Sequence, residues 1–149
     1  GYARREEDVV CLDTDVIRDS MFNTNLLLLG GILTNTVMKK CNSEFPAKFS
    51  GESFPYDRIE TPLSSFTDEK IGLIAKTENP RDSAKSIYTV AGIRNSGTRA
   101  AVEAFKELEE VVEGYKSGEF YSVVKGLDMD GDGKIDDYEV LETNTEAKE

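Results

Sequence analysis

The strongest β-forming run of this chain is Ser86-Ile87-Tyr88-Thr89-Val90-Ala91-Gly92-Ile93, which is rich in β-branched and aromatic residues. A polar segment, Arg94-Asn95-Ser96-Gly97-Thr98-Arg99, follows it directly and can cap a helix. After it, apolar residues recur every three or four positions, and these are Val102, Phe105, Leu108, Val112 and Tyr115. The sequence therefore predicts a strand that leads into an amphipathic helix, with these apolar residues on the face that meets the core.

A second strand is predicted upstream, at Asn25-Leu26-Leu27-Leu28-Leu29-Gly30-Gly31. This run is short, continuously apolar and closed by paired glycines, which is typical of a strand buried on both faces in a parallel sheet. Thr34 and Asn35 follow, and either can cap a short helix that reaches about Cys41.

The remaining elements are predicted from shorter patterns. Residues 8–13 and 70–76 predict strands, and residues 78–82 predict a turn that contains proline. Residues 42–68 hold three of the four prolines and have no clear period, so we expect a long surface loop or an irregular hairpin there.

This order of strands and helices predicts an α/β fold. We expect a small, mostly parallel sheet with packed helices, followed by a C-terminal EF-hand-like calcium loop. The predicted organisation is an α/β domain over residues 1–117, a calcium-binding segment over 118–142 that packs on it, and a frayed tail over 143–149.

Composition excludes several classes of function. The chain has 149 residues, which fits one domain, and its 38% hydrophobic content fits a globular fold. It has no histidine, which excludes Ser-His-Asp and Cys-His nucleophile systems and the common His-containing zinc sites. A net charge of -11 argues against binding to nucleic-acid phosphates or anionic lipid. No apolar run approaches the roughly 20 residues needed to span a membrane, so we expect no direct membrane insertion.

The negative charge is concentrated in the last third of the chain. Residues 1–100 carry 14 acidic and 13 basic side chains, whereas residues 101–149 carry 15 acidic and 5 basic ones. Such asymmetry is typical of a cation site or an acidic tail.

The acidic third contains a twelve-residue pattern of the EF-hand calcium loop, residues 128–139. Gly133 at the sixth position supplies the turn, and Ile135 at the eighth is apolar, as expected for a residue that holds the loop to the core. The predicted calcium ligands are the side chains of Asp128, Asp130, Asp132, Asp136 and Glu139 and the backbone carbonyl of Lys134.

The segments around this loop differ from those of a helix-loop-helix hand. Residues 118–127 have glycine near both ends and a β-forming centre, so we favour a strand entering the loop over a helix. Calcium sensors pair two hands around a Met-rich groove, and this chain has one loop, which favours a structural calcium clamp over a switch.

Weaker candidates lie elsewhere in the chain. Gly30-Gly31 and Ser96-Gly97-Thr98 each follow a predicted strand, so both could lie at the carboxyl ends of adjacent parallel strands, where α/β folds bind ligands. Neither matches a phosphate-binding motif, and turn and cap roles are favoured. Asp13 and Asp15 also follow a strand, and Cys11 and Cys41 either form one disulfide or remain two thiols.

The order of these segments resembles the repeated α/β domain of archaeal S-layer proteins, which form cell-surface lattices. The matching features are Leu12-Asp13, the run 25–31 with Asn35, Glu78-Asn79-Pro80, residues 86–92 and Gly97-Thr98-Arg99-Ala100-Ala101. The paired glycines depart from the family pattern, because Ile32-Leu33 follow them where proline and a small residue are usual. The resemblance implies a secreted, non-enzymatic module of the cell surface that associates with neighbouring domains or with copies of itself.

Three hypotheses of function result. The first is a calcium-stabilised extracellular module in which calcium clamps the C-terminal segment. The second is a calcium-dependent sensor or dockerin-like binder, which would expose apolar residues near Ile135, Tyr138 and Val140. The third is a small enzyme with a site at the strand ends near Gly31 and Gly97 that uses Asp13 or Asp15.

Overall fold

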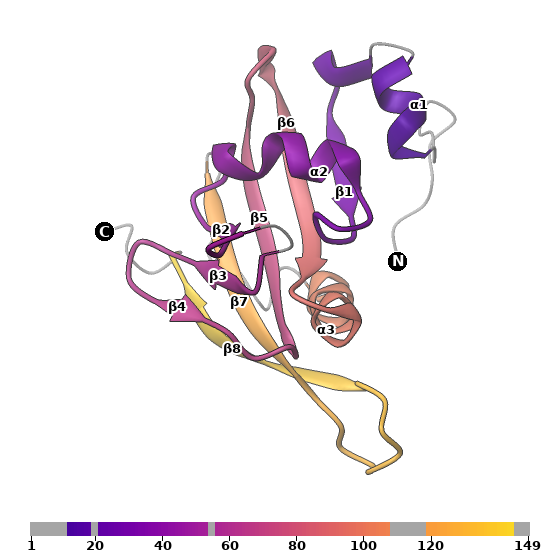
Figure 1. Ribbon diagram of the computed structural model, residues 1–149, viewed down its shortest axis with the longest axis vertical. Coiled ribbons are helices and arrows are strands. Elements are labelled where there is room, and N and C mark those ends of the chain that lie inside the picture. Colours follow the sequence, from indigo (N-terminus) through magenta and orange to yellow (C-terminus); the bar gives the residue numbers. More distant parts are fainter. Residues whose placement is uncertain (1–11, 19–20, 54–55, 108–118, 145–149) are drawn as a thin grey trace.

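A computed structural model describes residues 12–18, 21–53, 56–107 and 119–144, and Figure 1 shows their arrangement. A five-stranded sheet has the order β1-β6-β5-β7-β8, and a three-stranded sheet has the order β2-β3-β4. The elements are α1 (Asp13–Arg18), the 3-10 turn η1 (Met21–Asn23), β1 (Leu26–Leu29), α2 (Thr36–Cys41), the 3-10 turn η2 (Asn42–Glu44), β2 (Lys48–Ser50), β3 (Arg58–Glu60), β4 (Ser65–Phe66), β5 (Ile71–Asn79), β6 (Asp82–Gly92), α3 (Asn95–Phe105), β7 (Phe120–Leu127) and β8 (Asp137–Thr143).

The expectation of an α/β fold with a mostly parallel sheet was wrong. The described residues form a mostly β structure, in which the pair β1 and β6 is parallel and the other pairs of both sheets are antiparallel. The cause lies in the predicted turn at 78–82, since Asn79 pairs with Asp82 and two residues connect β5 to β6. So short a connection can join only antiparallel strands, because a parallel pair needs a crossover of a dozen or more residues.

The strand β1 lies at an edge of the five-stranded sheet, and its burial differs from the expectation. Leu28 is buried, but 49% of Leu27 and 59% of Leu29 are exposed. The run of four leucines therefore buries one side of the strand. The prediction of a strand buried on both faces was wrong because α3 covers the middle of the sheet and not this edge.

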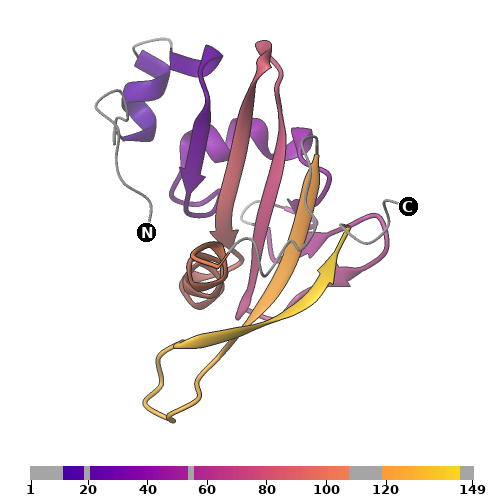
Figure 2. The ribbon, with the colours of Figure 1, turned by 180° about the vertical axis from the view of Figure 1, so that it is seen from behind.

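The two faces of the five-stranded sheet have different covers. Helix α2 and the three-stranded sheet lie on the face seen in Figure 1, and α3 lies on the opposite face, seen in Figure 2. We call these the α2 face and the α3 face. Asn35 caps α2 as predicted, since its Oδ1 accepts a hydrogen bond from the N–H of Met38 at 3.0 Å.

Helix α3 begins close to the predicted place, but a different side of it meets the sheet. The buried residues are Gly97, Ala100, Ala101 and Ala104, whereas Val102 is 36% exposed. A Cβ on Gly92 would lie 2.0 Å from the N atom of Thr98, so the helix backbone rests directly on the strand. Only small side chains fit in that gap. Of the predicted face, Phe105 is partly buried against the same core, whereas Val102 is not part of it. Leu108, Val112 and Tyr115 lie outside the described residues.

Residues 42–68 contain more structure than the predicted loop. They form η2 and the strands β2, β3 and β4, and the side chains of Phe49 and Ile59 are buried on the α2 face. The Asn42 side chain holds this region together, because it both donates to and accepts from the backbone of Phe49 at 2.9 Å.

The C-terminal segment belongs to the same sheet as the rest of the chain. Strand β7 pairs with β5 on one side and with β8 on the other. The predicted frayed tail begins too early, since Thr143 ends β8 and the Asn144 side chain accepts a hydrogen bond from the N–H of Tyr121 at 2.9 Å. The division at residue 118 stays a prediction.

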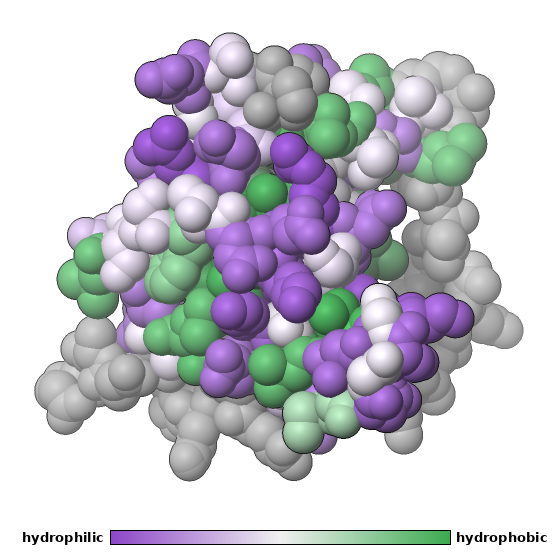
Figure 3. Space-filling view, turned by 60° about the horizontal axis from the view of Figure 1, so that its bottom comes forward, coloured by the Kyte–Doolittle hydropathy of each residue, from purple (hydrophilic) through white to green (hydrophobic). Residues whose placement is uncertain are grey.

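The face of the molecule shown in Figure 3 carries both hydrophobic and hydrophilic side chains. Figure 3 views the end of the molecule at which β1 and β6 finish, and hydrophobic side chains appear there in separate patches among hydrophilic ones. No helix among the described residues is long and apolar enough to cross a membrane.

Candidate metal centre in the β7–β8 hairpin

The predicted calcium loop connects two antiparallel strands. Strand β7 enters it and β8 leaves it, and Figure 1 shows this hairpin projecting beyond the rest of the sheet. The prediction of a strand before the loop is confirmed. The loop is therefore a hairpin connection and not the centre of a helix-loop-helix unit.

Four of the predicted ligands come together in this loop, namely Asp128, Asp130, Asp132 and Asp136. Each offers one carboxylate oxygen, and these oxygens all lie within 4.8 Å of one another. Asp128 is half-buried and the other three are exposed. No other group of three or more His, Cys, Asp or Glu among the described residues meets that distance.

Backbone N–H groups shape the loop around Asp128. Its Oδ1 accepts hydrogen bonds from the N–H of Gly131 at 2.9 Å and of Asp132 at 3.2 Å, and its Oδ2 accepts one from Gly133 at 2.7 Å. The glycines make this wrapping possible, because Gly131 and Gly133 have φ values of 76° and 87°, which side chains with a Cβ rarely adopt.

The other three aspartates make similar bonds. Asp130 accepts from the N–H of Asp132 at 3.1 Å, Asp132 from that of Lys134 at 2.8 Å, and Asp136 from that of Met129 at 2.9 Å. The loop thus turns its N–H groups inward to the carboxylates and holds them at a shared centre.

Backbone hydrogen bonds and neighbouring carboxylates shift the pKa values of Asp128 and Asp130 in opposite directions. The N–H of Gly133 is the largest cause that lowers the pKa of Asp128. The N–H of Asp132 acts to lower the pKa of Asp130, but loss of hydration and the neighbouring carboxylates of Asp128, Asp132 and Asp136 together outweigh it and raise that pKa. The loop therefore holds mutually repelling negative charges that a cation would relieve.

Ile135 attaches the loop to the core, as its position in the pattern predicts. It is 5% exposed and packs with the core of the α3 face. Gly126 makes the room for it, because a Cβ on Gly126 would lie 2.9 Å from Ile135 Cγ2. The calcium pattern does not include Gly126, although a glycine inside a strand can mark a close approach of this kind.

The last two predicted ligands, Lys134 and Glu139, lie outside the group of four aspartates. Glu139 is not part of the group of four aspartates and lies on β8, where it pairs with Lys125 across the hairpin. Lys134 lies between Asp132 and Ile135, and its N–H donates to Asp132. Its side-chain charge is exposed, as expected for a residue that would offer only its carbonyl.

The weaker predicted residues have other roles. The Asp13 carboxylate accepts a hydrogen bond from the Thr36 N–H at 2.6 Å, and the bonds to Thr36 lower its pKa. Asp13 therefore stabilises the start of α2. The structure does not describe Cys11 or the side chain of Asp15. Cys41 is a buried free thiol, and burial raises its pKa.

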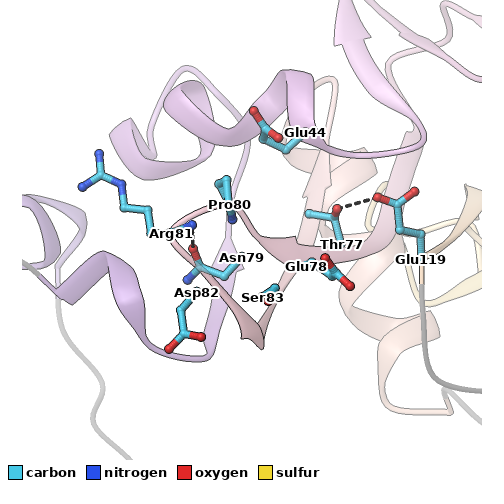
Figure 4. A pocket seen from close by; sticks show the side chains of 9 residues that line it. All are labelled: Glu44, Thr77, Glu78, Asn79, Pro80, Arg81, Asp82, Ser83 and Glu119. Atoms are coloured by element: carbon cyan, nitrogen blue, oxygen red, sulfur yellow. Dashed lines mark hydrogen bonds between the residues drawn. The ribbon is translucent and has the colours of Figure 1, made fainter.

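A hollow of about 400 Å³ lies beside the β5–β6 turn. Figure 4 shows the side chains that line it. Its acidic side chains lie apart and do not converge on one point, and the Glu119 carboxylate accepts a hydrogen bond from the Thr77 hydroxyl at 2.8 Å. We assign no site there.

The predicted meeting of the two glycine segments is confirmed. Gly30-Gly31 and residues 96–98 follow the parallel strands β1 and β6, and Gly30, Gly31, Ser96 and Thr98 line one cavity of about 480 Å³.

Comparison of the chain with protein-family models, with curated proteins and with solved structures found no match.

Proposed function

We propose that the β7–β8 loop binds calcium and that the chain is a non-enzymatic, calcium-stabilised module. One observation carries the proposal: the carboxylate oxygens of Asp128, Asp130, Asp132 and Asp136 lie within 4.8 Å of one another. They occupy the first, third, fifth and ninth positions of a twelve-residue calcium pattern.

The donor set fits calcium better than zinc or copper. Every side chain of the group offers oxygen, whereas zinc and copper sites use nitrogen and sulfur ligands. Calcium accepts six to eight oxygens in a flexible geometry, so carbonyls and water can complete a shell that four aspartates begin. The Lys134 carbonyl and Glu139 are the expected further ligands, and Glu139 would have to reach the group from β8.

A clamp is favoured over a switch because of what surrounds the loop. Ile135 is buried and Tyr138 is partly buried against the α3-face core, whereas a sensor or dockerin-like binder would expose them. Val140 is 41% exposed and alone among these residues agrees with the second hypothesis. Calcium bound here would hold Ile135 in place and fasten β8 to β7.

The role of Asp13 does not support the enzyme hypothesis. The third hypothesis needs Asp13 or Asp15 near the strand ends, but the Asp13 carboxylate binds the N-terminal N–H of α2 and does not line the cavity. The proposal of an extracellular, cell-surface module that associates with neighbouring domains or with itself rests on the resemblance of the sequence to S-layer domains.

Calorimetric titration with calcium and thermal melts in excess chelator test this proposal. We expect one calcium per chain and a lower melting temperature after chelation. A bound ion at one hundred times its dissociation constant stabilises the folded state by about 2.7 kcal/mol.

Asp130→Asn is the informative variant, because it removes a ligand charge while leaving an oxygen that can accept the Asp132 N–H. Asp137→Asn is the matched control, since Asp137 is exposed and lies outside the group of four. We expect the first change to weaken calcium binding at least about tenfold and the second to have little effect. Absence of calcium binding by the unmodified chain, or equal loss in both variants, would contradict the proposal.

A further inference from the structure

The connections that follow the parallel strands β1 and β6 leave the sheet in opposite directions. After β1 the chain passes to α2 on one face of the sheet, and after β6 it passes to α3 on the other. Two adjacent parallel strands whose connections diverge in this way leave a crevice between the loops, and in open α/β sheets such a crevice is where ligands bind.

This crevice is present as a cavity of about 480 Å³, which we call the strand-end crevice. Its apolar wall includes Ile32 and Phe49, which are buried, and Tyr56, which is partly buried. Gly31 allows the two loops to approach, because a Cβ there would lie 2.9 Å from the Gly92 carbonyl oxygen. Topology and cavity therefore identify the same place independently.

The polar side of the crevice favours negative charge. The exposed Arg94 lines it, and no side chain caps the start of α3 at this residue. The first N–H groups of an α-helix have no partner within the helix and attract anions. Ser96 is oriented by its own bond to the Glu69 carbonyl at 3.0 Å, so the wall is ordered.

We propose that the strand-end crevice binds a small organic anion, a carboxylate or phosphate group joined to an apolar body. The anionic group would meet Arg94 and the start of α3, and the apolar body would lie against Ile32, Phe49 and Tyr56. Glu69 lines the same cavity, and its negative charge would oppose the anion and limit the affinity. This site shares no residue with the acidic loop and does not depend on calcium.

Amide NMR titrations with benzoate, phenyl phosphate and benzyl alcohol test the proposal. We expect millimolar benzoate or phenyl phosphate to shift the amide signals of Gly31, Ser96 and Gly97, and the neutral alcohol to bind more weakly. The two anions separate preference for a carboxylate from preference for a phosphate. Absence of shifts at these amides, or binding of the alcohol as tight as that of both anions, would overturn the proposal.

Variants of exposed charges make the test specific. Arg94→Gln should weaken binding of the anion at least about threefold, and Glu69→Gln should strengthen it. Lys106→Gln is the matched control, because it removes the same charge at the other end of α3. Equal effects of Arg94→Gln and Lys106→Gln would show a general charge effect and would refute a site in the crevice.

Discussion

The two faces of the five-stranded sheet are covered in different ways. On the α3 face, glycine and alanine let the helix backbone rest on the strands, whereas the α2 face is filled by large side chains such as Met38, Phe49 and Ile59. Close approach of backbones has little tolerance for added atoms, because no side chain is there to move. A core of large side chains instead loses stability when atoms are removed. We therefore expect substitutions that add atoms to destabilise the α3 face and substitutions that remove atoms to destabilise the α2 face.

The largest effect is expected from Gly92→Ala on the α3 face. The new Cβ would lie 2.0 Å from the Thr98 N atom, so the start of α3 must move away from the sheet. We expect a loss of about 3 kcal/mol or more in the free energy of unfolding, measured by urea denaturation. Gly51→Ala is the control. Its Cβ would approach no atom closer than 3.0 Å, and that nearest atom belongs to the Asp57 side chain, which can move. A loss no larger than that of the control would show that α3 is not tightly seated.

A comparable or somewhat smaller loss is expected on the α2 face from Ile59→Ala. Ile59 is fully buried between the three-stranded sheet and the main core, and its truncation leaves a cavity. We expect a loss of about 2 to 5 kcal/mol, again by urea denaturation. Leu63→Ala should change stability by no more than about 0.5 kcal/mol, because Leu63 is 79% exposed. Similar small losses in both variants would mean that the three-stranded sheet contributes little.

The smallest effect concerns pH and a polar contact of the α2 face. Glu142 on β8 accepts a hydrogen bond from the Tyr121 hydroxyl at 2.6 Å. Partial burial acts to raise the pKa of Glu142, but bonds from Thr61, Tyr121 and Ser64 outweigh it and lower that pKa below its ordinary value of 4.5. The contact therefore stabilises the fold above about pH 4.5 and is lost as the pH falls through the lowered pKa.

Thermal melts across this pH range check the prediction. The unmodified chain should lose melting temperature on acidification more steeply than Glu142→Gln, whose side chain does not titrate. Parallel melting curves for the two proteins would show that the Glu142 contact adds no stability.

The candidate metal site was more predictable than the fold. The ligand spacing, the glycine turn and the apolar anchor all lie within residues 128–139, and four of the predicted ligands do come together. A local pattern of this kind is specified by short-range geometry, since Asp128, Asp130 and Asp132 bind N–H groups within five residues of themselves. Glu139 was harder to place because its position depends on how β8 pairs with β7.

Strand direction was the main failure of prediction. The segments near 70–76 and 86–93 were identified as strands, and the turn between them was identified too. The error was to assume a parallel sheet from the apolar run at 25–31, although the two-residue connection between β5 and β6 requires an antiparallel pair.

By itself, the sequence determined the local features: where the chain turns, which runs extend, and where oxygen ligands recur at calcium spacing. Only the tertiary structure decided which side of α3 meets the sheet and which edge of the sheet stays exposed. The physical reason is that burial depends on the partner. Ala100 and Ala104 are buried while Val102 is partly exposed, because the glycines of the sheet leave room for small side chains alone.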